Sequence, residues 1–263
     1  FNDDDSAYMA RTPAGAGNRK TWTLSFWIKR SAIESALAYD WFIFSSTNYF
    51  RIGFKGDSSI IDHFIIRSST ESVDLTTSQK FRDAGGWYHI VIAFDTTEST
   101  ESDRVKLYVN GTQVTAFSTA DYPGEDTDND WNDSSVHEIG RSASFAGRYY
   151  DGYLSEVHNI DGTALDPTSF GERGDYGEWK PIEYTGSYGT NGFYLDFADA
   201  ADLGDDESGN GNDFTETNLT ESDQMLDTPT NNFSTWNPLT KGSYVTFSEG
   251  NLRTAGNTTD SGN

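Results

Sequence analysis

Carboxylate side chains alternate along one acidic stretch of the chain. Asp126, Asp128 and Asp130 are separated by single residues. Oxygen ligands at alternate loop positions can converge on a hard cation such as Ca²⁺. The stretch is not an EF-hand loop, because Trp131 stands where the sharp turn needs glycine and the closing glutamate is missing. Two interpretations stay open: a calcium site at the rim of the fold, or a solvated acidic loop.

A second cluster of cation ligands is suggested by a stretch rich in Gly, Asn and Asp at residues 204–213. Asp205, Asp206 and Asn210 are its candidate ligands, and the same two interpretations apply to them. A third acidic group, at residues 3–5, is a weaker candidate. The only cofactor that the sequence suggests is therefore Ca²⁺.

Four aromatic residues are candidates for contacts with a sugar. Trp131 lies in the acidic stretch, and Tyr149, Tyr150 and Tyr188 lie close to glycines. A ring with an apolar face and polar groups around it suits a polar, ring-shaped ligand. Contacts with a neighbouring subunit would explain exposed aromatic residues equally well.

The motifs of several enzyme classes are missing. The histidines, His63, His89, His137 and His158, show no spacing for a metal on one helix face, and His89 is expected to be structural. There is no Gly-x-Ser-x-Gly elbow and no phosphate-binding Gly-rich loop. Glycoside hydrolysis needs a pair of carboxyl groups, but the acidic pairs of this chain lie in loops without strand spacing. We therefore predict that the protein is not an enzyme.

Composition narrows the partners further. The 263-residue chain carries a net charge of −24 and contains no cysteine. A strongly acidic surface argues against nucleic acid and against insertion into or binding to anionic membranes, and the lack of cysteine excludes disulfides and thiolate zinc sites. The sequence shows no secretory signal and starts without methionine, so we expect a portion of a longer polypeptide.

The elements that must position these side chains are predicted to be β-strands. In Thr21–Arg30, Trp22, Leu24, Phe26 and Ile28 alternate with mostly polar residues, as in a strand with one face in the core.

The stretch Arg104–Phe117 predicts a hairpin, because Asn110 and Gly111 tolerate the positive φ of a tight type I′ turn. Further strands are expected at residues 49–55, 60–67, 87–95, 152–160 and 192–197, and a short helix is expected to start at Asp166 and Pro167. The pattern predicts an all-β, two-sheet antiparallel sandwich over residues 1–233, followed at 234–263 by an extended linker or the start of another β module.

Several of these segments resemble laminin-G-like and pentraxin-like lectin domains. Gly86–Asp95 and Val105–Gly111 resemble an aromatic-His strand followed by a strand that ends in Tyr-Val-Asn-Gly. Trp22–Lys29, Asp151–Val157 and the loop Asp206–Asp213 resemble other parts of the family pattern, although this loop usually lies near the start of the domain. The resemblance implies a concanavalin A-like jelly roll, a fold that glucanases share, but their pattern of two Glu and one Asp on one strand face is absent.

The combination of motifs also resembles laminin-G domains in structural proteins of marine tailed phages. It implies a virion surface or tail-fibre protein that binds host cell-surface glycan, contacts other virion proteins and forms a homo-oligomer such as a trimer. One alternative is a purely architectural virion decoration or spacer domain without sugar binding. Another is a polysaccharide-degrading enzyme of concanavalin-like fold.

Overall fold

A computed structural model describes residues 1–31, 33, 41–47, 49–56, 62–69, 73–142, 144–145, 148–240, 242 and 244–256. Its strands are β1 Tyr8–Arg11, β2 Thr21–Arg30, β3 Trp41–Ser46, β4 Arg51–Phe54, β5 His63–Ser68, β6 Val73–Lys80, β7 Tyr88–Asp95, β8 Val105–Val109, β9 Thr112–Gln113, β10 Phe117–Asp121, β11 His137–Ile139, β12 Gly152–Asp161, β13 Gly171–Arg173, β14 Trp179–Pro181, β15 Phe193–Leu195, β16 Thr215–Thr217, β17 Val245–Ser248 and β18 Arg253–Gly256. Four short 3₁₀ turns complete the elements: η1 Glu101–Asp103, η2 Pro167–Ser169, η3 Glu221–Asp223 and η4 Pro238–Thr240.

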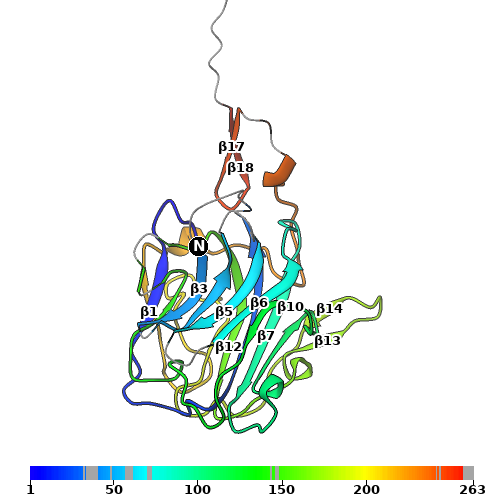
Figure 1. The fold of residues 1–263 in the computed structure, drawn as a ribbon. Helices are drawn as coiled ribbons and strands as arrows, with labels where there is room; N and C mark the ends of the chain where they lie inside the picture. Colours follow the sequence, from blue (N-terminus) through cyan, green and yellow to red (C-terminus); the bar gives the residue numbers. More distant parts are fainter. Residues whose placement is uncertain are drawn as a thin grey trace, which may run out of the picture.

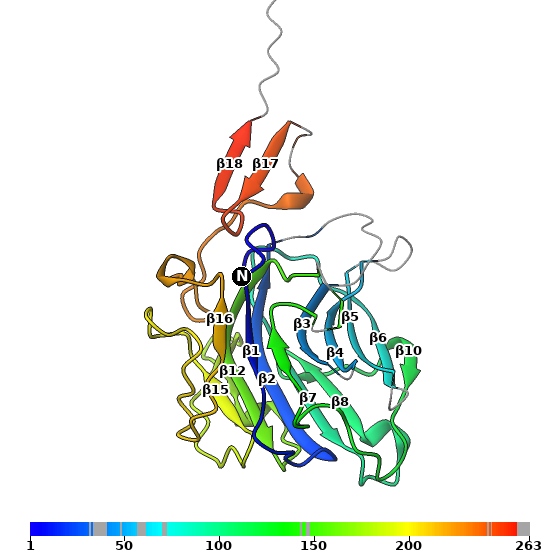
Figure 2. The same ribbon diagram turned by 90° about the vertical axis from the view of Figure 1, so that its left-hand side faces the viewer.

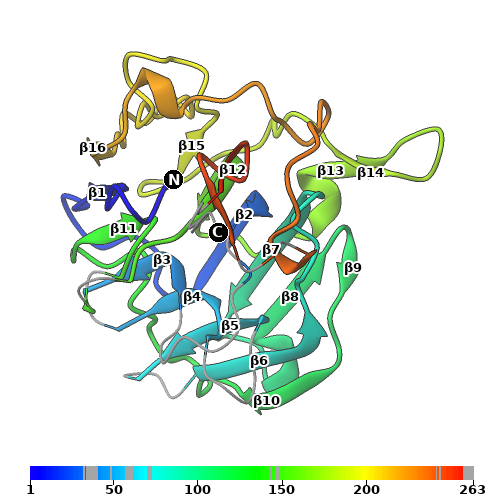
Figure 3. The same cartoon turned by 90° about the horizontal axis from the view of Figure 1, so that it is seen from above.

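Two antiparallel sheets form the body of the molecule, as predicted. One has eight strands in the order β10-β6-β5-β4-β3-β11-β1-β16, and the other has six in the order β15-β12-β2-β7-β8-β9. Seen from above, the strands of the two sheets lie in two layers (Figure 3). The long strands of the six-stranded sheet run side by side through the centre of the molecule (Figure 2).

The alternation in β2 decides which face of the six-stranded sheet meets the core. Trp22, Leu24, Phe26 and Ile28 are all fully buried. Trp22 stacks on the ring of Phe94 in β7, with 4.7 Å between ring centroids. Such aromatic pairs add specific geometry to the burial of apolar area, which is the main force that holds two sheets together.

The predicted hairpin between β8 and β9 is confirmed in its turn. Asn110 has a φ of +48° and Gly111 a φ of +75°, the signs that a type I′ turn requires. A side chain at Gly111 would also collide with the ring of Trp179, whose atoms come within 2.5 Å of an ideal Cβ position. The glycine therefore serves both the turn and the packing of the β13–β14 hairpin against it.

Other sequence expectations are met with shifted limits. The strand expected at residues 60–67 begins at His63, and residues 60 and 61 lie outside the described part of the chain. The short helix expected at Asp166 is one 3₁₀ turn, capped where Asp166 accepts a hydrogen bond of 2.8 Å from the backbone N–H of Thr168. Near the end of the chain, β17 and β18 form a separate two-stranded hairpin that stands away from the sandwich (Figures 1 and 2).

The outer face of the six-stranded sheet is partly covered by the segment that follows β12. Thr23 Oγ1 donates to the carbonyl of Thr163 at 2.7 Å and accepts from the N–H of Leu165 at 2.8 Å. Farther along, the β13–β14 hairpin packs its Trp179 against His89 of β7. This cover leaves part of β12 and β15 accessible, and the candidate site lies there.

Candidate functional site

Trp131 lies in the core and not on the surface. Its side chain is fully buried, and its indole N–H donates to Asn159 Oδ1 at 2.8 Å. The ring of Phe44 meets it edge-on at 6.2 Å. The sequence-based hypothesis that Trp131 stacks on a sugar is therefore wrong, because neither face of the ring is open to a ligand.

The alternating carboxylates beside Trp131 pair with two neighbouring bases, Lys20 and Arg19. Asp126 pairs with Lys20 at 3.2 Å, and Arg19 pairs with Asp130 at 3.4 Å and with Asp128 at 3.9 Å. Among the residues that the structure describes, no group of three or more His, Cys, Asp or Glu side chains is placed to hold a metal ion. The stretch therefore has the geometry of an acidic loop tied to neighbouring cations.

The residues of the second predicted cation cluster form hydrogen bonds with nearby backbone groups. Asp206 accepts hydrogen bonds from the backbone N–H groups of Tyr194, Ser208 and Asn212 at 2.8–2.9 Å, so it acts as a structural brace for this loop. The amide of Asn210 donates to the carbonyls of residues 189 and 192.

Asp205 belongs to a neighbouring turn of the same loop, in which its backbone N–H bonds to the carbonyl of Asp202 at 3.4 Å. The loop thus positions the start of β15 and the residues before it, and the polar groups of Asp206 and Asn210 are engaged in hydrogen bonds within this region.

Two of the four predicted sugar-contacting residues lie together at a different place. Tyr150 is only 2% exposed, and its hydroxyl donates to the carbonyl of Lys29 at 2.9 Å, so a sugar contact for Tyr150 is also wrong. Tyr149 is half-buried beside Tyr8, with ring centroids 6.4 Å apart. Neither residue lines the pocket to which Tyr188 belongs. Tyr188 is part of a cluster that the sequence did not reveal.

That cluster surrounds a pocket on the outer face of the six-stranded sheet, which we call the tyrosine pocket. Its volume is about 340 Å³, and it is lined by Glu156, His158, Pro181, Ile182, Glu183, Tyr184, Tyr188, Tyr194 and Glu207. The three tyrosines are half-buried, so each side chain is partly packed and partly accessible. Ligand pockets in proteins have volumes of about 300–1,000 Å³, and this pocket falls at the small end.

A β-bulge in β12 positions Glu156, one of the three glutamates of the pocket. The pairing of β12 with β2 shifts register between Ser155 and His158, and Glu156 has a φ of +50° within this bulge. A non-glycine residue in this backbone region is strained, and such residues cluster at functional sites. Bulges also re-aim side chains, and this one directs Glu156 to the hydroxyl of Tyr194.

Two glycines bring Tyr188 against the sheet. An added side chain at Gly189 would come within 2.1 Å of the carbonyl oxygen of Asp161, and one at Gly192 within 1.9 Å of the carbonyl of Tyr188. The backbone N–H of Asp161 donates to that same carbonyl of Tyr188 at 2.8 Å. The loop therefore needs both glycines to approach β12 this closely.

Aromatic rings form one wall of the pocket. His158 and Tyr194 are directly paired across β12 and β15, and their rings are parallel within 3° at a centroid distance of 4.3 Å. Tyr188 lies beside the same pair, with its ring centroid 6.0 Å from that of His158 and 6.4 Å from that of Tyr194. Tyr184 meets Tyr188 at 86° and 5.2 Å, so the wall turns a corner.

The wall carries an acidic side chain, Glu156, and a histidine, His158, that burial keeps uncharged. Tyr194 donates its hydroxyl proton to Glu156 at 2.6 Å. Burial raises the pKa of Glu156, and this hydrogen bond opposes the shift only in part. Burial lowers the pKa of His158 to about 3, so the imidazole is neutral near neutral pH and its Nδ1 lies 3.0 Å from the hydroxyl of Tyr188.

A buried Ser-His contact elsewhere on the same face is not arranged for catalysis. Ser25 Oγ lies 2.9 Å from His89 Nε2, and the indole N–H of Trp179 donates to His89 Nδ1 at 2.8 Å. An indole N–H can only donate, so Nδ1 accepts and the proton of the neutral ring sits on Nε2. In this tautomer His89 donates to Ser25 and has no free lone pair to remove its proton. Burial keeps the ring neutral by lowering its pKa to about 3.

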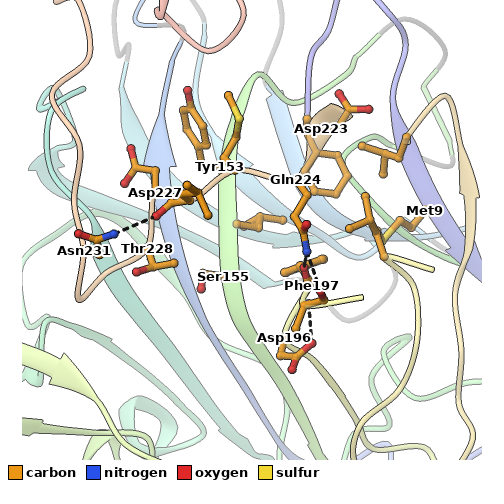
Figure 4. A pocket seen from close by; sticks show the side chains of 17 residues that line it. Met9, Tyr153, Ser155, Asp196, Phe197, Asp223, Gln224, Asp227, Thr228 and Asn231 are labelled. Carbon is orange, nitrogen blue, oxygen red and sulfur yellow. Dashed lines mark hydrogen bonds between the residues drawn. The ribbon is translucent and has the colours of Figure 1, made fainter. Parts of the chain in front are cut away.

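A second pocket, of about 350 Å³, opens at the edge between the two sheets. Figure 4 shows the side chain of Gln224 directed at the backbone of Phe197, where it donates to the carbonyls of Phe197 and Ala198. Asp227 on its rim already bonds to the ammonium of Lys29 at 2.7 Å and to the indole of Trp87 at 2.8 Å. This edge pocket lies where residues of the later part of the chain pack against the sandwich.

Comparison with protein families agrees with the fold. The family model described as "Concanavalin A-like lectin/glucanases superfamily" matches residues 3–168. No curated protein matches the chain significantly in sequence. None of the helical segments in the described ranges is long and apolar enough to cross a membrane.

Among solved structures, the chain is similar to a candidate carbohydrate-binding protein from Bacteroides ovatus, with 13% identity, a TM-score of 0.52 and coverage of 80% of this chain and 56% of that one. The chain thus spans little more than half the length of that relative. Weaker likenesses include domain 4 of AbnA, an arabinanase of Geobacillus stearothermophilus in complex with arabinotriose (18% identity, TM-score 0.40, 60% of this chain and 68% of that one). Mouse laminin α1 chain domains LG4–5 follow at 15% identity and a TM-score of 0.35, with 60% and 41% covered.

Proposed function

We propose that this chain, which belongs to the concanavalin A-like lectin/glucanases superfamily, binds glycan in the tyrosine pocket without catalysing a reaction. The observation that carries the proposal is the pairing of three half-buried tyrosines with three glutamates around one pocket of about 340 Å³. Tyrosine rings offer an apolar face to the C–H groups of a sugar. Glutamate oxygens accept hydrogen bonds from its hydroxyl groups.

Preorganisation supports the same proposal. His158 packs against both Tyr188 and Tyr194, and Glu156 accepts a hydrogen bond from the hydroxyl of Tyr194. A ligand would therefore meet rings and acceptors that are already in place. Binding then costs less conformational entropy than it would with mobile side chains.

Affinity electrophoresis in gels that contain single polysaccharides tests the proposal. We expect at least one polysaccharide to retard the wild-type protein, and the double variant Tyr188→Ala, Tyr194→Ala to run as it does in the empty gel. Tyr176→Ala is the matched control, because Tyr176 is 97% exposed and lies outside the pocket. A polysaccharide that retards the double variant as strongly as the wild type would place the binding site elsewhere. A panel that retards no protein would contradict glycan binding.

The absence of catalysis is part of the proposal and has its own support. The Ser25–His89 contact has the wrong tautomer for activating a serine. The pocket contains three carboxyl groups, so hydrolysis is a meaningful alternative. Incubation of a bound polysaccharide with the protein should release no reducing ends, and their release would favour the polysaccharide-degrading alternative.

The wider setting is proposed from the resemblance to phage structural proteins. There the domain would sit on the virion surface, in a tail fibre or similar appendage, and bind host cell-surface glycan. Calcium would order loops of the domain. Binding of the labelled protein to host cells, with and without EGTA, tests both ideas. Saturable binding that EGTA abolishes is expected if a calcium site exists, and unchanged binding in EGTA would remove calcium from the proposal.

A specific observation favours self-association as well. Six of the eight exposed large hydrophobic residues in the described part of the chain lie between Leu226 and Leu252. They are Leu226, Phe233, Trp236, Leu239, Tyr244 and Leu252. In a chain of net charge −24, residues 228–256 hold a single acid, Glu249, and two bases. This segment can therefore meet a copy of itself without the repulsion that the acidic body would cause.

The position of the C-terminal hairpin suits such a contact. It stands away from the sandwich (Figures 1 and 2), so two copies joined there would keep their bodies apart. Asn251 donates to the carbonyl of Ser31 at 2.7 Å, and Tyr153 donates to that of Gly250 at 2.7 Å, which fixes the hairpin to the body. We expect the wild type to sediment as an oligomer and Trp236→Ser as a monomer. A wild-type monomer at every concentration would contradict self-association.

A further inference from the structure

We propose that the tyrosine pocket selects neutral glycans and rejects glycans that carry carboxylate, sulfate or phosphate groups. This inference rests on the proposed function, because it names the class of glycan that the same pocket takes. It concerns the charge of the ligand, which neither the fold nor the likeness to other structures determines.

The lining of the tyrosine pocket offers negative charge and no permanent positive charge. Of the nine residues that line the pocket, three are glutamates and none is lysine or arginine. The cation next to it in sequence, Lys180, is engaged with Glu172 at 3.0 Å. His158 could supply a positive charge, but its ring is 3% exposed and packed against Tyr188 and Tyr194, where a charged imidazole would lack solvation. An anionic sugar would therefore find no positively charged side chain among the lining residues.

Carboxylates next to the lining residues make the potential around the pocket negative. The carboxylates of Asp196 and Asp205 are the main causes that raise the pKa of Glu207. Burial raises the pKa of Glu156, and Asp196 adds to the shift. The shift of Glu207 thus reports the negative potential of its carboxylate neighbours, and Glu156 and Glu183 add two more carboxyl groups to the same lining. An added anion would experience the same repulsion.

The glutamates of the pocket are suited to hydrogen bonds with hydroxyl groups. An ionised carboxylate only accepts hydrogen bonds, and a neutral sugar supplies many O–H donors. Glu156 already accepts from Tyr194 through one oxygen, and its side chain remains 30% exposed. The same groups that would bind a neutral sugar thus exclude an acidic one, which is how a site obtains specificity through repulsion.

The test is affinity electrophoresis of the full chain against a fixed panel. The neutral members are galactan, arabinan, xylan, mannan and dextran, and the acidic members are polygalacturonate, alginate, hyaluronan and carrageenan. We expect the polymers that retard the wild type to be neutral, with retardation by any acidic member weaker by about tenfold or more. An acidic polymer that binds as well as the best neutral one would overturn the selectivity while leaving glycan binding intact. A panel with no binding at all would contradict the proposed function itself, and the inference with it.

A pair of charge variants separates the pocket from the overall acidity of the chain. The triple variant Glu156→Gln, Glu183→Gln, Glu207→Gln should reduce the discrimination against the acidic polymers. The control variant Glu98→Gln, Glu125→Gln, Glu221→Gln removes the same charge from exposed positions outside the pocket, and it should discriminate as the wild type does. Equal behaviour of the two triple variants would assign the selectivity to net charge and would overturn a filter built into the pocket.

Discussion

The acidic loop around Trp131 and the loop that carries Tyr188 have the same appearance in sequence and opposite places in the structure. Both combine aromatic residues with carboxylates in a polar segment. Trp131 is fully buried, whereas Tyr188 is half-buried at a pocket. The difference lies in what the interior offers. Asn159 lies in the core and accepts a hydrogen bond from the indole N–H of Trp131. Around Tyr188, three tyrosine side chains stay partly accessible.

The comparison teaches that an aromatic residue in an acidic loop is not by itself a ligand contact. Its role depends on whether the fold provides a buried partner for its polar atom. The carboxylates follow the same rule. Asp126 and Asp130 are paired with Lys20 and Arg19, whereas the glutamates of the tyrosine pocket have no lysine or arginine among the lining residues.

Replacing Trp131 by alanine should have the largest effect. It would leave a cavity in the core and remove the hydrogen-bond partner of Asn159, so we expect the free energy of unfolding to fall by about 3–5 kcal/mol. Chemical denaturation measures this loss. At a temperature where the variant is still folded, glycan binding should be unchanged, and a specific loss of binding would break the distinction between the two loops.

Acidification should weaken the protein through histidines in both regions. His137, beside Trp131, has its pKa lowered to about 4 by burial, and His158 in the tyrosine pocket to about 3, from an unfolded value of 6.5. Between these values and 6.5 the unfolded state binds more protons than the folded state. Stability should therefore be complete above pH 6.5 and fall as the pH drops, by up to about 1.4 kcal/mol per pH unit for each histidine.

Denaturation curves across this pH range test the effect. His158→Gln, which cannot gain a proton, should show a shallower fall than the wild type. A slope identical to that of the wild type would mean that His158 takes up its proton as readily in the folded state as in the unfolded state, which would contradict the lowered pKa of His158.

Removing the ring of Tyr188 should separate binding from stability. Because the residue is half-buried, Tyr188→Ala should cost less stability than Trp131→Ala. Affinity for a bound polysaccharide should fall about fivefold or more, since losing an aromatic contact at the centre of a site costs over about 1 kcal/mol. Tyr176→Ala should change neither property. A Tyr188→Ala variant that binds normally would contradict the assignment of the pocket.

The smallest effect is expected at Asp126. Its carboxylate is 68% exposed and pairs with a lysine on the surface, so Asp126→Asn should change stability by at most about 1 kcal/mol. The thermal midpoint should respond to calcium equally in this variant and in the wild type. A calcium-dependent rise in the wild type that the variant lacks would restore the loop as a cation site.

The fold could be predicted largely because its central strands obey simple rules. The alternation from Trp22 to Ile28 and the Asn110–Gly111 turn depend on local sequence alone. The tyrosine pocket depends on pairing between distant segments. His158 meets Tyr194 only when β12 pairs with β15, and Glu156 faces them only because of the bulge. No local pattern announces either feature, so the sequence led to Tyr188 and missed its neighbours.

The most direct test follows the tyrosine rings themselves during binding. The protein would be labelled with ¹³C in its tyrosine rings and ¹⁵N in its indoles, and titrated with a soluble fragment of a neutral polysaccharide that it binds. The account predicts that ring signals of Tyr184, Tyr188 and Tyr194, assigned through single Tyr→Phe variants, shift and saturate together while the indole signal of Trp131 stays in place. Unmoved signals from these three tyrosines at saturation, with shifts elsewhere, would contradict the assignment of the site.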